Sequence, residues 1–524
     1  MTEASDYMIL PPFKNEGYID PSNPEVRKKM KEALDKVSNE KRHFDLIIGG
    51  KHQKTDRVTE SRNPSNPSEI VGTVSKTDKK MIDAAMDVAW KTFETWKHTP
   101  AEERVKPFLK AAQIMRERRY ELDATMILEV GKNWIEADAD LAEAIDFLEF
   151  YSREAVRYAS PQPVIQIPPE KNELVYIPLG VGAVIPPWNF CSAIMAGMTT
   201  AAAISGNCVL QKPASDAPII AAKFVEILHE AGLPEGVINF VPGSGSEIGD
   251  YIVEHPRTRF ISFTGSKEVG LRINELAARH QEGQKWLKRV VLEMGGKDAV
   301  VVDETADLEA AAEGCVTSAF GFQGQKCSAG SRIIAVESIY DKLLEKVVEK
   351  TKKIKVGDVR DPENWLGPVI NESAQEKIMK YIEIGKKEGR IACGGETVDD
   401  LPGFFIKPTV IEGVKRDDRV AQEEIFGPVT SFIKAKNFND AMNIANSTEY
   451  GLTGALYSRD RNRIEKAKKV FHVGNLYFNR KCTGALVGVQ PFGGFNMSGT
   501  DSKAGGRDYL LLFQQAKSIS EKIL

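Results

Sequence analysis

The chain has few cysteines and none of the patterns by which cysteines and histidines bind metals. Its six cysteines are scattered through 524 residues, with no C-x-x-C pair and no cysteine–histidine cluster at short spacing. Structural zinc sites need four such ligands at short, regular spacings. The sequence therefore predicts no metal site.

Long apolar runs and targeting signals are also lacking. The most apolar stretch, residues 193–204, is too short and too rich in threonine and glycine to span a bilayer. Residues 1–25 contain acids and prolines, without the basic start, apolar core and small-residue cleavage site of a signal peptide. We expect a cytoplasmic protein that does not bind membranes.

A strong positive charge is absent as well. The formal net charge is -4 and the isoelectric point is near 6.1, so no overall basic field would attract a polyanion. We therefore expect no nucleic-acid partner. Apolar residues make up 42% and charged residues 27% of the chain, which is typical of a globular protein, and its length predicts two or three domains.

The spacing of apolar residues predicts helices first and then alternating strands and helices. A charged helix over residues 24–41 precedes amphipathic helices over residues 78–96 and 101–130. The proline-rich residues 160–173 predict an extended connection or an edge strand. From residue 174 onward, and again over residues 298–495, short apolar runs alternate with amphipathic segments. This alternation predicts α/β domains with parallel sheets wound on both faces.

Two turns that follow predicted strands are candidates for phosphate binding. A phosphate needs backbone N–H groups at a helix start, with glycines that allow it to come close. Neither turn has the standard spacing of a dinucleotide-binding motif, and an ordinary strand-to-helix turn is the alternative for each. The residues are Gly243, Gly245 and Gly249 in one turn and Thr264, Gly265 and Ser266 in the other.

Three polar residues are candidates for catalysis, and each has a plainer alternative. Cys327 lies among glycines beside Lys326, and a cationic neighbour lowers the pKa of a thiol, although most lone cysteines are small buried hydrophobes. Glu293 follows an apolar strand, where a carboxylate acts as a general base or is simply solvated. Asn189 follows another strand and offers an amide donor, although asparagine is also common in turns.

These candidates lie in six motifs whose order along the chain is typical of one family. The motifs are PWNF (187–190), KPAS (212–215), FTGS (263–266), LEMGGKD (292–298), GQKCSAGSR (324–332) and EEIFGPV (423–429). Through them the chain resembles the aldehyde dehydrogenase superfamily from about residue 45 to its C-terminus. The resemblance implies an α/β fold with a Rossmann-like cofactor domain, an α/β catalytic domain and a small oligomerisation element.

The resemblance also divides the chain and assigns catalytic roles. It implies an NAD(P)-binding domain in residues 1–158 and 174–297, a catalytic domain in residues 298–495, and an oligomerisation element in residues 159–173 and 496–524. Cys327 would attack the aldehyde carbon, and Asn189 with the backbone N–H of Cys327 would hold the oxyanion. Glu293 would activate the water that hydrolyses the thioester. Because acylating relatives that use CoA generally lack this glutamate, we expect a free acid as the product.

The cofactor implied by the resemblance is NAD, with NADP tolerated. Many relatives that prefer NAD carry a glutamate after KPA, which would repel a 2′-phosphate, whereas this chain has Ser215 there. Lys212 is expected at the adenine ribose, Ser266 at the pyrophosphate and Glu424 at the nicotinamide ribose. The expected cofactor-binding residues are Ile185, Pro187, Trp188, Lys212, Ser215, Gly245, Gly249, Phe263, Thr264, Gly265, Ser266, Glu424 and Phe426.

The expected substrate is L-glutamate 5-semialdehyde, an intermediate of proline and arginine breakdown. Residues 129–147, 320–332 and 478–494 are similar to the members of the superfamily that oxidise it. Its ammonium and carboxylate groups both need partners when they are enclosed. Backbone N–H groups of residues 483–485 and the hydroxyl of Ser328 would bind the carboxylate. The expected substrate-binding residues are Glu143, Phe190, Lys326, Ser328, Gly484, Ala485 and Phe492.

Three alternatives stay open on the sequence alone. The chain could oxidise another semialdehyde with the same catalytic residues, it could require CoA, or it could keep the fold without catalysis. Glu143 also has a plain alternative as part of a solvated helix face.

The apolar tail that ends the chain indicates packing against a partner subunit, and the resemblance implies a homodimer or a higher homo-oligomer.

Overall fold

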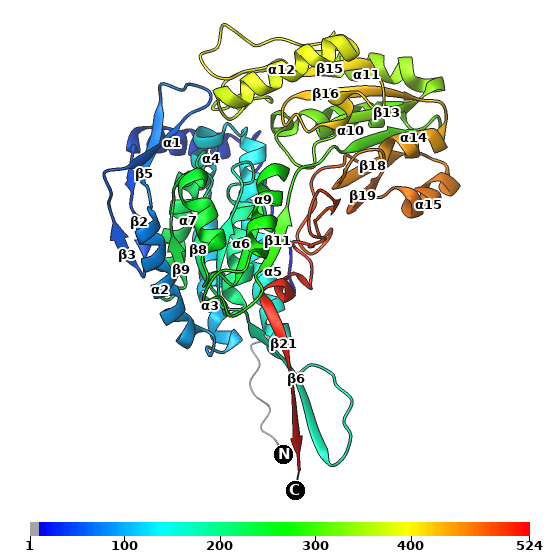
Figure 1. Cartoon of the computed structure of the whole chain (residues 1–524). Coiled ribbons are helices and arrows are strands. Elements are labelled where there is room, and N and C mark those ends of the chain that lie inside the picture. Colours follow the sequence, from blue (N-terminus) through cyan, green and yellow to red (C-terminus); the bar gives the residue numbers. More distant parts are fainter. Residues whose placement is uncertain (1–9, 524) are drawn as a thin grey trace.

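Two seven-stranded sheets, each with helices on both sides, form two lobes of the molecule (Figure 1). The computed structural model describes residues 10–523. We call the part built on strands from residues 46–293 the N-terminal lobe, and the part built on strands from residues 299–478 the C-terminal lobe. A two-stranded ribbon projects from the N-terminal lobe. The predicted α/β class with parallel sheets is confirmed.

The sheet of the N-terminal lobe is parallel over five strands and ends in two antiparallel ones. Its central strands are buried on both faces, which explains why they are continuous apolar runs rather than alternating ones. In sheet order the strands are β11 (Arg289–Glu293), β10 (Phe260–Thr264), β7 (Val181–Ile185), β8 (Cys208–Gln211), β9 (Ile238–Phe240), β2 (Leu46–Ile48) and β3 (Lys51–Gln53).

The helices of this lobe confirm two of the predicted segments and correct a third. The helix predicted over residues 101–130 is two helices, because the backbone of Arg118 leaves the helical conformation while the apolar spacing continues across it. Apolar spacing does not reveal a break of one residue. The helices are α1 (Pro24–Glu40), α2 (Lys79–Trp96), α3 (Ala101–Glu117), α4 (Arg119–Val130), α5 (Trp134–Ala159), α6 (Ala193–Ile204), α7 (Pro218–Glu230), α8 (Asp250–Glu254) and α9 (Lys267–Ala278).

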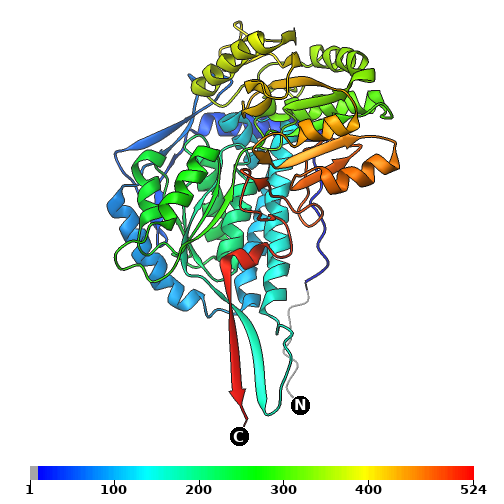
Figure 2. The same ribbon diagram turned by 45° about the vertical axis from the view of Figure 1, so that its right-hand side comes forward.

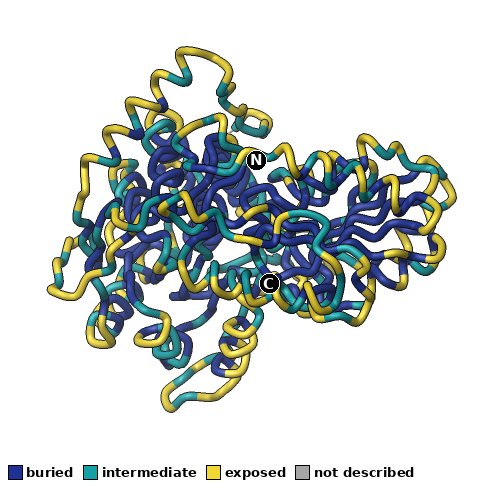
Figure 3. Tube along the Cα trace, turned by 90° about the horizontal axis from the view of Figure 1, so that it is seen from above, coloured by how far each residue is buried: buried dark blue, intermediate teal, exposed yellow. Residues whose placement is uncertain are grey.

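The sheet of the C-terminal lobe is parallel except for its edge strand β14. In sheet order its strands are β14 (Arg390–Cys393), β15 (Thr409–Val414), β16 (Val429–Ala435), β13 (Arg332–Val336), β12 (Ala299–Val302), β18 (Thr453–Tyr457) and β19 (Asn475–Phe478). The helices are α10 (Leu308–Phe320), α11 (Tyr340–Lys352), α12 (Glu372–Glu388), α13 (Arg419–Gln422), α14 (Phe438–Ala445) and α15 (Arg461–Val470). Figure 3 shows a buried core in each lobe.

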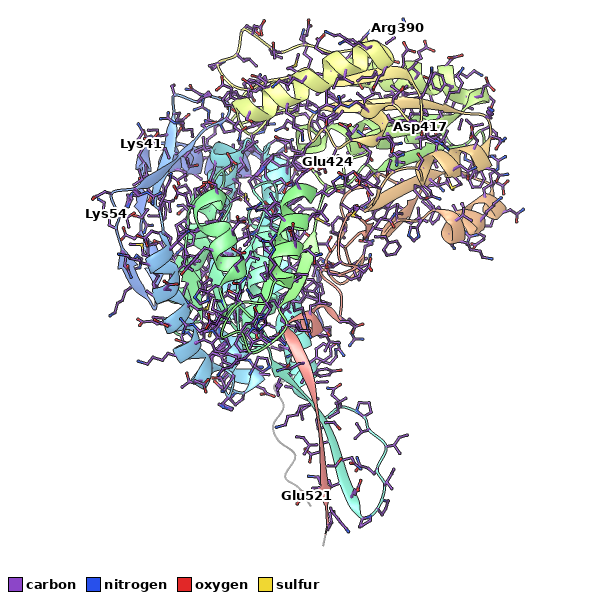
Figure 4. All side chains as sticks on the ribbon, in the orientation of Figure 1. Lys41, Lys54, Arg390, Asp417, Glu424 and Glu521 are labelled. Atoms are coloured by element: carbon purple, nitrogen blue, oxygen red, sulfur yellow. The ribbon has the colours of Figure 1, made fainter. Side chains whose placement is uncertain are left out.

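The ribbon consists of β6 (Glu170–Pro178) and β21 (Gln514–Lys522), paired antiparallel along their whole length. Figure 4 places Glu521 far from both lobes, and most side chains of β21 are exposed. Of residues 160–173, predicted as an extended connection or an edge strand, residues 161–169 have no regular structure and residues 170–173 begin β6. Smaller sheets pair β1 (His43–Phe44), β5 (Ile70–Ser75) and β4 (Val58–Arg62), and β17 (Tyr450–Gly451) with β20 (Phe495–Asn496).

The chain passes between the two sheets over residues 294–298, from the end of β11 to the start of β12. In open parallel sheets, ligands bind beyond the carboxyl ends of the strands. Strands β7, β10 and β11 all end near this crossing, and their last residues are Ile185, Thr264 and Glu293. Among the helices of residues 10–523, none is both long and apolar enough to cross a membrane.

Candidate active site

Cys327 lies where two pockets meet. One pocket, called here the cofactor cleft, lies beyond the ends of β7 and β10 and also contacts residues of the C-terminal lobe. The other, called the substrate pocket, is lined by α5, α6 and the loop of residues 484–490. Cys327 and Thr264 line both. A group bound in either pocket can therefore reach the sulfur.

A strained turn sets the position of Cys327. Phe322 and Gln323 have φ values of 48° and 58°, in the left-handed region that side-chain-bearing residues seldom occupy. The amide of Gln323 offsets this cost by donating to the carbonyls of Gly131, at 2.9 Å, and Pro368, at 2.8 Å. The turn is thus tied to elements of both lobes, and the loop that carries Cys327 is fixed.

The surroundings of Cys327 keep the thiol protonated. Burial raises its pKa well above the usual value, and the carboxyl groups of Asp298, Glu424 and Glu293 raise it further. The sequence-based expectation that Lys326 lowers the thiol pKa is wrong, because its ammonium turns to Glu136, 2.7 Å away. Activation of the thiol therefore requires a base or a cationic group brought into the site.

Asn189 is held close to the Cys327 loop. It is 4% exposed and lies between β7 and α6, where it lines the cofactor cleft. Its Nδ2 donates to the carbonyl of Gln325, two residues before Cys327, at 2.9 Å. An amide nitrogen carries two hydrogens, so one N–H remains for an oxygen bound beside Cys327.

Glu293 ends β11 and lines the substrate pocket with Cys327. The Ser502 hydroxyl donates to its Oε1, and Oε2 is buried with no hydrogen-bond partner among the described residues. Burial raises the pKa of Glu293 to about 8, against the opposing effects of Ser502 and Lys503. A carboxyl group with such a pKa exchanges protons near neutral pH, as a general base must.

The cofactor cleft contains most of the residues expected to bind NAD. Lys212 is 5% exposed, and the one hydrogen-bond partner of its ammonium among residues 10–523 is the carbonyl of Pro213 at 3.2 Å. Burial lowers the pKa of Lys212 to about 8. The expected residues that line the cleft are Ile185, Pro187, Trp188, Lys212, Gly245, Gly249, Phe263, Thr264, Gly265, Ser266, Glu424 and Phe426.

The two turns that were candidates for phosphate binding have different geometries. Gly245 and Gly249 begin and end a short π-helix, and a Cβ at either one would meet no other described atom within 4 Å. Ser266 caps α9, while the N–H of Gly265 donates to the carbonyl of Glu293 at 3.1 Å. The open space at the first turn and the helix start at the second suit a phosphate.

Glu424 lies at the junction of the two lobes, as Figure 4 shows. Its Oε1 accepts from the N–H of Gly296 in the crossing segment, at 3.0 Å. The neighbouring Phe426 has a φ of 62° and meets Trp188 edge-on, with ring centres 5.7 Å apart. A carboxylate acceptor beside an aromatic pair fits the ribose hydroxyls and flat ring of a nicotinamide nucleoside.

Ser215 departs from the expectation. It is exposed in the turn after β8, and its neighbour Ala214 lines the cleft instead. In the substrate pocket, Lys326 is likewise outside the lining, because it is paired with Glu136. The expected residues that do line the substrate pocket are Glu143, Phe190, Ser328, Gly484, Ala485 and Phe492.

Several residues that line the pockets were not among the candidates from the sequence. Phe147 and Tyr151 follow Glu143 at four-residue intervals on α5, so helical spacing would have indicated them. Lys132 lines neither pocket but lies behind Phe190, fully buried, with its ammonium 4.6 Å from the ring centre of Phe190 and 3.1 Å from Asp140. Further such lining residues include Ile194, Met198, Leu486, Val487, Gln490 and Tyr509 in the substrate pocket and Asp250, Arg272 and Lys377 in the cofactor cleft.

The chain is similar to known proteins of one family. The aldehyde dehydrogenase family model matches residues 51–519. A 1-pyrroline-5-carboxylate dehydrogenase of Geobacillus sp. is 58% identical over 514 residues, covering 98% of this chain and 100% of the relative. One of Geobacillus thermodenitrificans is 57% identical over the same shares. The solved structure of a 1-pyrroline-5-carboxylate dehydrogenase from Thermus with bound NAD has a TM-score of 0.97 and 53% identity, covering 98% of this chain and 100% of that one.

The family model spans most of the chain, and relatives more than half identical match nearly all of it. The predicted aldehyde dehydrogenase fold is confirmed by the same comparisons. This chain belongs to the aldehyde dehydrogenase family.

Proposed function

We propose that this protein oxidises L-glutamate 5-semialdehyde to L-glutamate and uses NAD as the electron acceptor. The observation that carries the proposal is the substrate pocket, which joins Cys327 and Glu293 to Glu143 on one wall and residues 484–485 on another. The names of the relatives support the same substrate, since L-glutamate 5-semialdehyde is the open form of 1-pyrroline-5-carboxylate. The NAD bound to the Thermus structure supports the cofactor.

The first step is attack of the Cys327 sulfur on the aldehyde carbon. A new C–S bond forms, the carbonyl π electrons move to oxygen, and the thiol proton passes to a water molecule bound in the pocket, so Glu293 stays ionised for the later step. The free N–H of Asn189 and the backbone N–H of Cys327 hold the resulting oxyanion. Removing one such preorganised donor costs about 3 to 4 kcal/mol of transition-state stabilisation, so Asn189 should contribute strongly to the rate.

Bound NAD supplies the hydride acceptor that converts the thiohemiacetal into a thioester. The residues that would hold it are Lys212 and Glu424 at the two riboses and Ser266 with the start of α9 at the pyrophosphate. Glu293 then takes a proton from water, whose oxygen attacks the thioester carbon. The C–S bond breaks and the free acid leaves, which returns Cys327 for another turnover.

The substrate pocket offers partners for both charged ends of the substrate. Glu143 has its pKa raised to about 8 by burial and by Asp140, and an ammonium ion brought beside it would favour its ionised form. On another wall, backbone N–H groups of residues 484–485 and the Ser328 hydroxyl face the carboxylate. Phe190 and Phe492 enclose the aliphatic part.

Use of NADP in addition to NAD is part of the proposal. Ser215 places no carboxylate at the edge of the cofactor cleft. Arg272 and Lys377 line the cleft, although Arg272 is paired with Asp250. A 2′-phosphate would therefore meet no built-in repulsion from residue 215.

The test compares L-glutamate 5-semialdehyde with pentanal, an uncharged aldehyde of equal chain length, and with succinic semialdehyde. A site built around buried polar partners discriminates against analogues that lack them by about 10⁴-fold, whereas an apolar pocket discriminates by about 10- to 200-fold. We expect kcat/KM for the charged substrate to exceed that for pentanal by about 10⁴-fold, without added CoA. Equal efficiency with pentanal or succinic semialdehyde would refute the substrate, and dependence on CoA would refute the free-acid product.

We also propose that the ribbon of β6 and β21 joins two or more copies of the chain in the cytoplasm. Its outer backbone edges pair with no other strand among the described residues, and an exposed sheet edge readily pairs with another strand. Ile165 and Ile167 beside it are 87% and 64% exposed, which is unusual for large apolar side chains of a monomer. All six cysteines are free, as in reducing compartments. Light scattering of the purified protein should give the mass of at least a dimer.

A further inference from the structure

Residues 10–22, called here the N-terminal arm, run along the outer side of α5 (Figure 2). They contain no helix or strand, so their position depends on side-chain and backbone contacts with the body. The N–H of Ile19 donates to Asp138 at 2.8 Å, and Arg119 donates to the carbonyl of Gly17 at 2.6 Å. The arm is thus attached to α5 at one end of its path.

Asn15 attaches the arm at a second point, where it joins two elements far apart in the sequence. Its Nδ2 donates to Oδ2 of Asp146 on α5, at 2.8 Å, and to the carbonyl of Val487, at 3.0 Å. Both hydrogens of the amide nitrogen are therefore used. Asp146 also accepts from the N–H of Glu16 through Oδ1, at 2.7 Å, so its two oxygens both hold the arm.

Packing around Asn15 strengthens this attachment. The ring of Phe13 meets that of Phe150 on α5 edge-on, with centres 5.2 Å apart. Both rings approach Gly488, whose φ of 76° suits glycine, and a Cβ there would touch each of them. The arm therefore fills the space between α5 and the loop of residues 484–490.

The two elements that Asn15 joins both line the substrate pocket. Asp146 follows Glu143 by three residues on α5, so the two side chains lie on neighbouring positions of one helix face. Val487 follows residues 484–485 in the loop and lines the pocket itself. The proposed partner of the substrate ammonium and the proposed partners of its carboxylate are thus connected through one side chain outside the pocket.

We propose that Asn15 is a positioning residue that determines substrate specificity, by holding the loop of residues 484–490 at the distance from α5 that fits a charged amino-acid aldehyde. The inference rests on the proposed function. Asn15 touches neither substrate nor cofactor. It acts through Glu143 on one side and residues 484–485 on the other, so its loss should affect binding of the two charged ends more than the chemistry at Cys327.

The experiment replaces Asn15 with leucine, which has a similar shape but forms neither hydrogen bond. We expect Asn15→Leu to raise KM for L-glutamate 5-semialdehyde about tenfold or more while kcat changes less than twofold. With pentanal, kcat/KM should stay within twofold of the wild-type value, because pentanal has neither charged end. Lys14→Ala, an exposed neighbour in the arm, is the matched control and should leave both substrates unchanged.

Three outcomes distinguish this inference from its alternatives. A parallel loss with both aldehydes would mean a purely structural role, and unchanged kinetics with both would mean no role, so either overturns it. If Asn15→Leu does not fold, as judged by its thermal unfolding, Asn15→Ser decides by the same criterion. If the wild-type enzyme itself lacks a preference for the charged substrate, the proposed function fails, and this inference fails with it.

Discussion

The cofactor cleft and the substrate pocket meet at Cys327 but are built in different ways. Most of the cleft consists of short consecutive segments at strand ends and helix starts, such as residues 185–189 and 263–266. The substrate pocket combines side chains from α5 and α6 with a loop that begins 280 residues after the end of α6. A ligand held by local backbone geometry leaves a compact sequence motif, whereas a pocket built from distant helix faces does not.

The two pockets also differ in the charged groups that burial perturbs. The cleft contains Lys212, whose pKa burial lowers to about 8. The substrate pocket contains Glu143 and Glu293, whose pKa values burial raises to about 8. In each case a group is taken out of water without a full ion-pair partner, so its charge responds to what binds next to it.

The largest expected effect comes from removing the sulfur, which should abolish catalysis but leave NAD binding in the cofactor cleft nearly unchanged. Cys327→Ala should reduce aldehyde oxidation by on the order of 10⁴-fold or more, because no covalent intermediate can form. The cofactor cleft keeps its other lining residues, so the dissociation constant for NAD should change by less than about threefold. Steady-state NADH formation and a titration of NAD fluorescence quenching measure the two effects. Retained turnover would show that Cys327 is not the nucleophile.

The next largest effect distinguishes a carboxyl group of the substrate pocket, Glu293, from one of the cofactor cleft, Glu424. Glu293→Gln keeps the shape and the acceptor for Ser502 but cannot take a proton, so thioester hydrolysis should slow by about 10²- to 10⁴-fold. One equivalent of NADH should then form in a burst, followed by a slow steady state, in stopped-flow absorbance. Glu424→Gln, on the cleft side, is the matched control and should raise KM for NAD without a burst. Loss of the burst in Glu293→Gln would contradict its role in hydrolysis.

The raised pKa of Glu293 predicts a smaller effect on the wild-type enzyme. The base must be ionised, and its pKa is about 8, so hydrolysis should increase with pH and level off above that value. Each unit of pH below about 7 should reduce the hydrolysis rate about tenfold, since the ionised fraction falls by that factor. Single-turnover decay of the acyl-enzyme across this range measures it. A rate independent of pH between 6 and 8 would mean that Glu293 is ionised throughout.

The contrast between local motifs and distant side chains also explains which parts of the molecule could be predicted from the sequence. The fold class, the helix over residues 79–96 and the cleft segments follow from local patterns, because apolar spacing and strand-end turns act over a few residues. The break at Arg118 was missed, since apolar spacing continues through it. Apart from Glu143, the helical side chains that line the substrate pocket were missed as well.

Contacts between side chains that are far apart in the sequence were the hardest feature to predict. Lys326 stands next to Cys327, yet its charge is taken by Glu136, 190 residues away. The hydrogen bond from Ser502 to Glu293 joins residues 209 positions apart, and that from Asn15 to Val487 joins residues 472 apart. No local pattern records such contacts, although they determine the protonation of the site and the shape of the pocket.

The smallest expected effect tests whether the edge of the cofactor cleft selects between NAD and NADP. Ser215→Glu adds a carboxylate at an exposed turn beside the lining residue Ala214. Two charges 4 Å apart in water interact by about 1 kcal/mol, and the 2′-phosphate carries up to two. We therefore expect kcat/KM with NADP to fall about tenfold, while that with NAD changes less than twofold. Ser215→Gln adds similar bulk without charge and should leave NADP use nearly unchanged, so equal losses in the two variants would indicate steric hindrance. If NADP kinetics do not change in Ser215→Glu, position 215 does not face the 2′-phosphate, and the tolerance of NADP must depend on residues inside the cleft, such as Arg272 and Lys377.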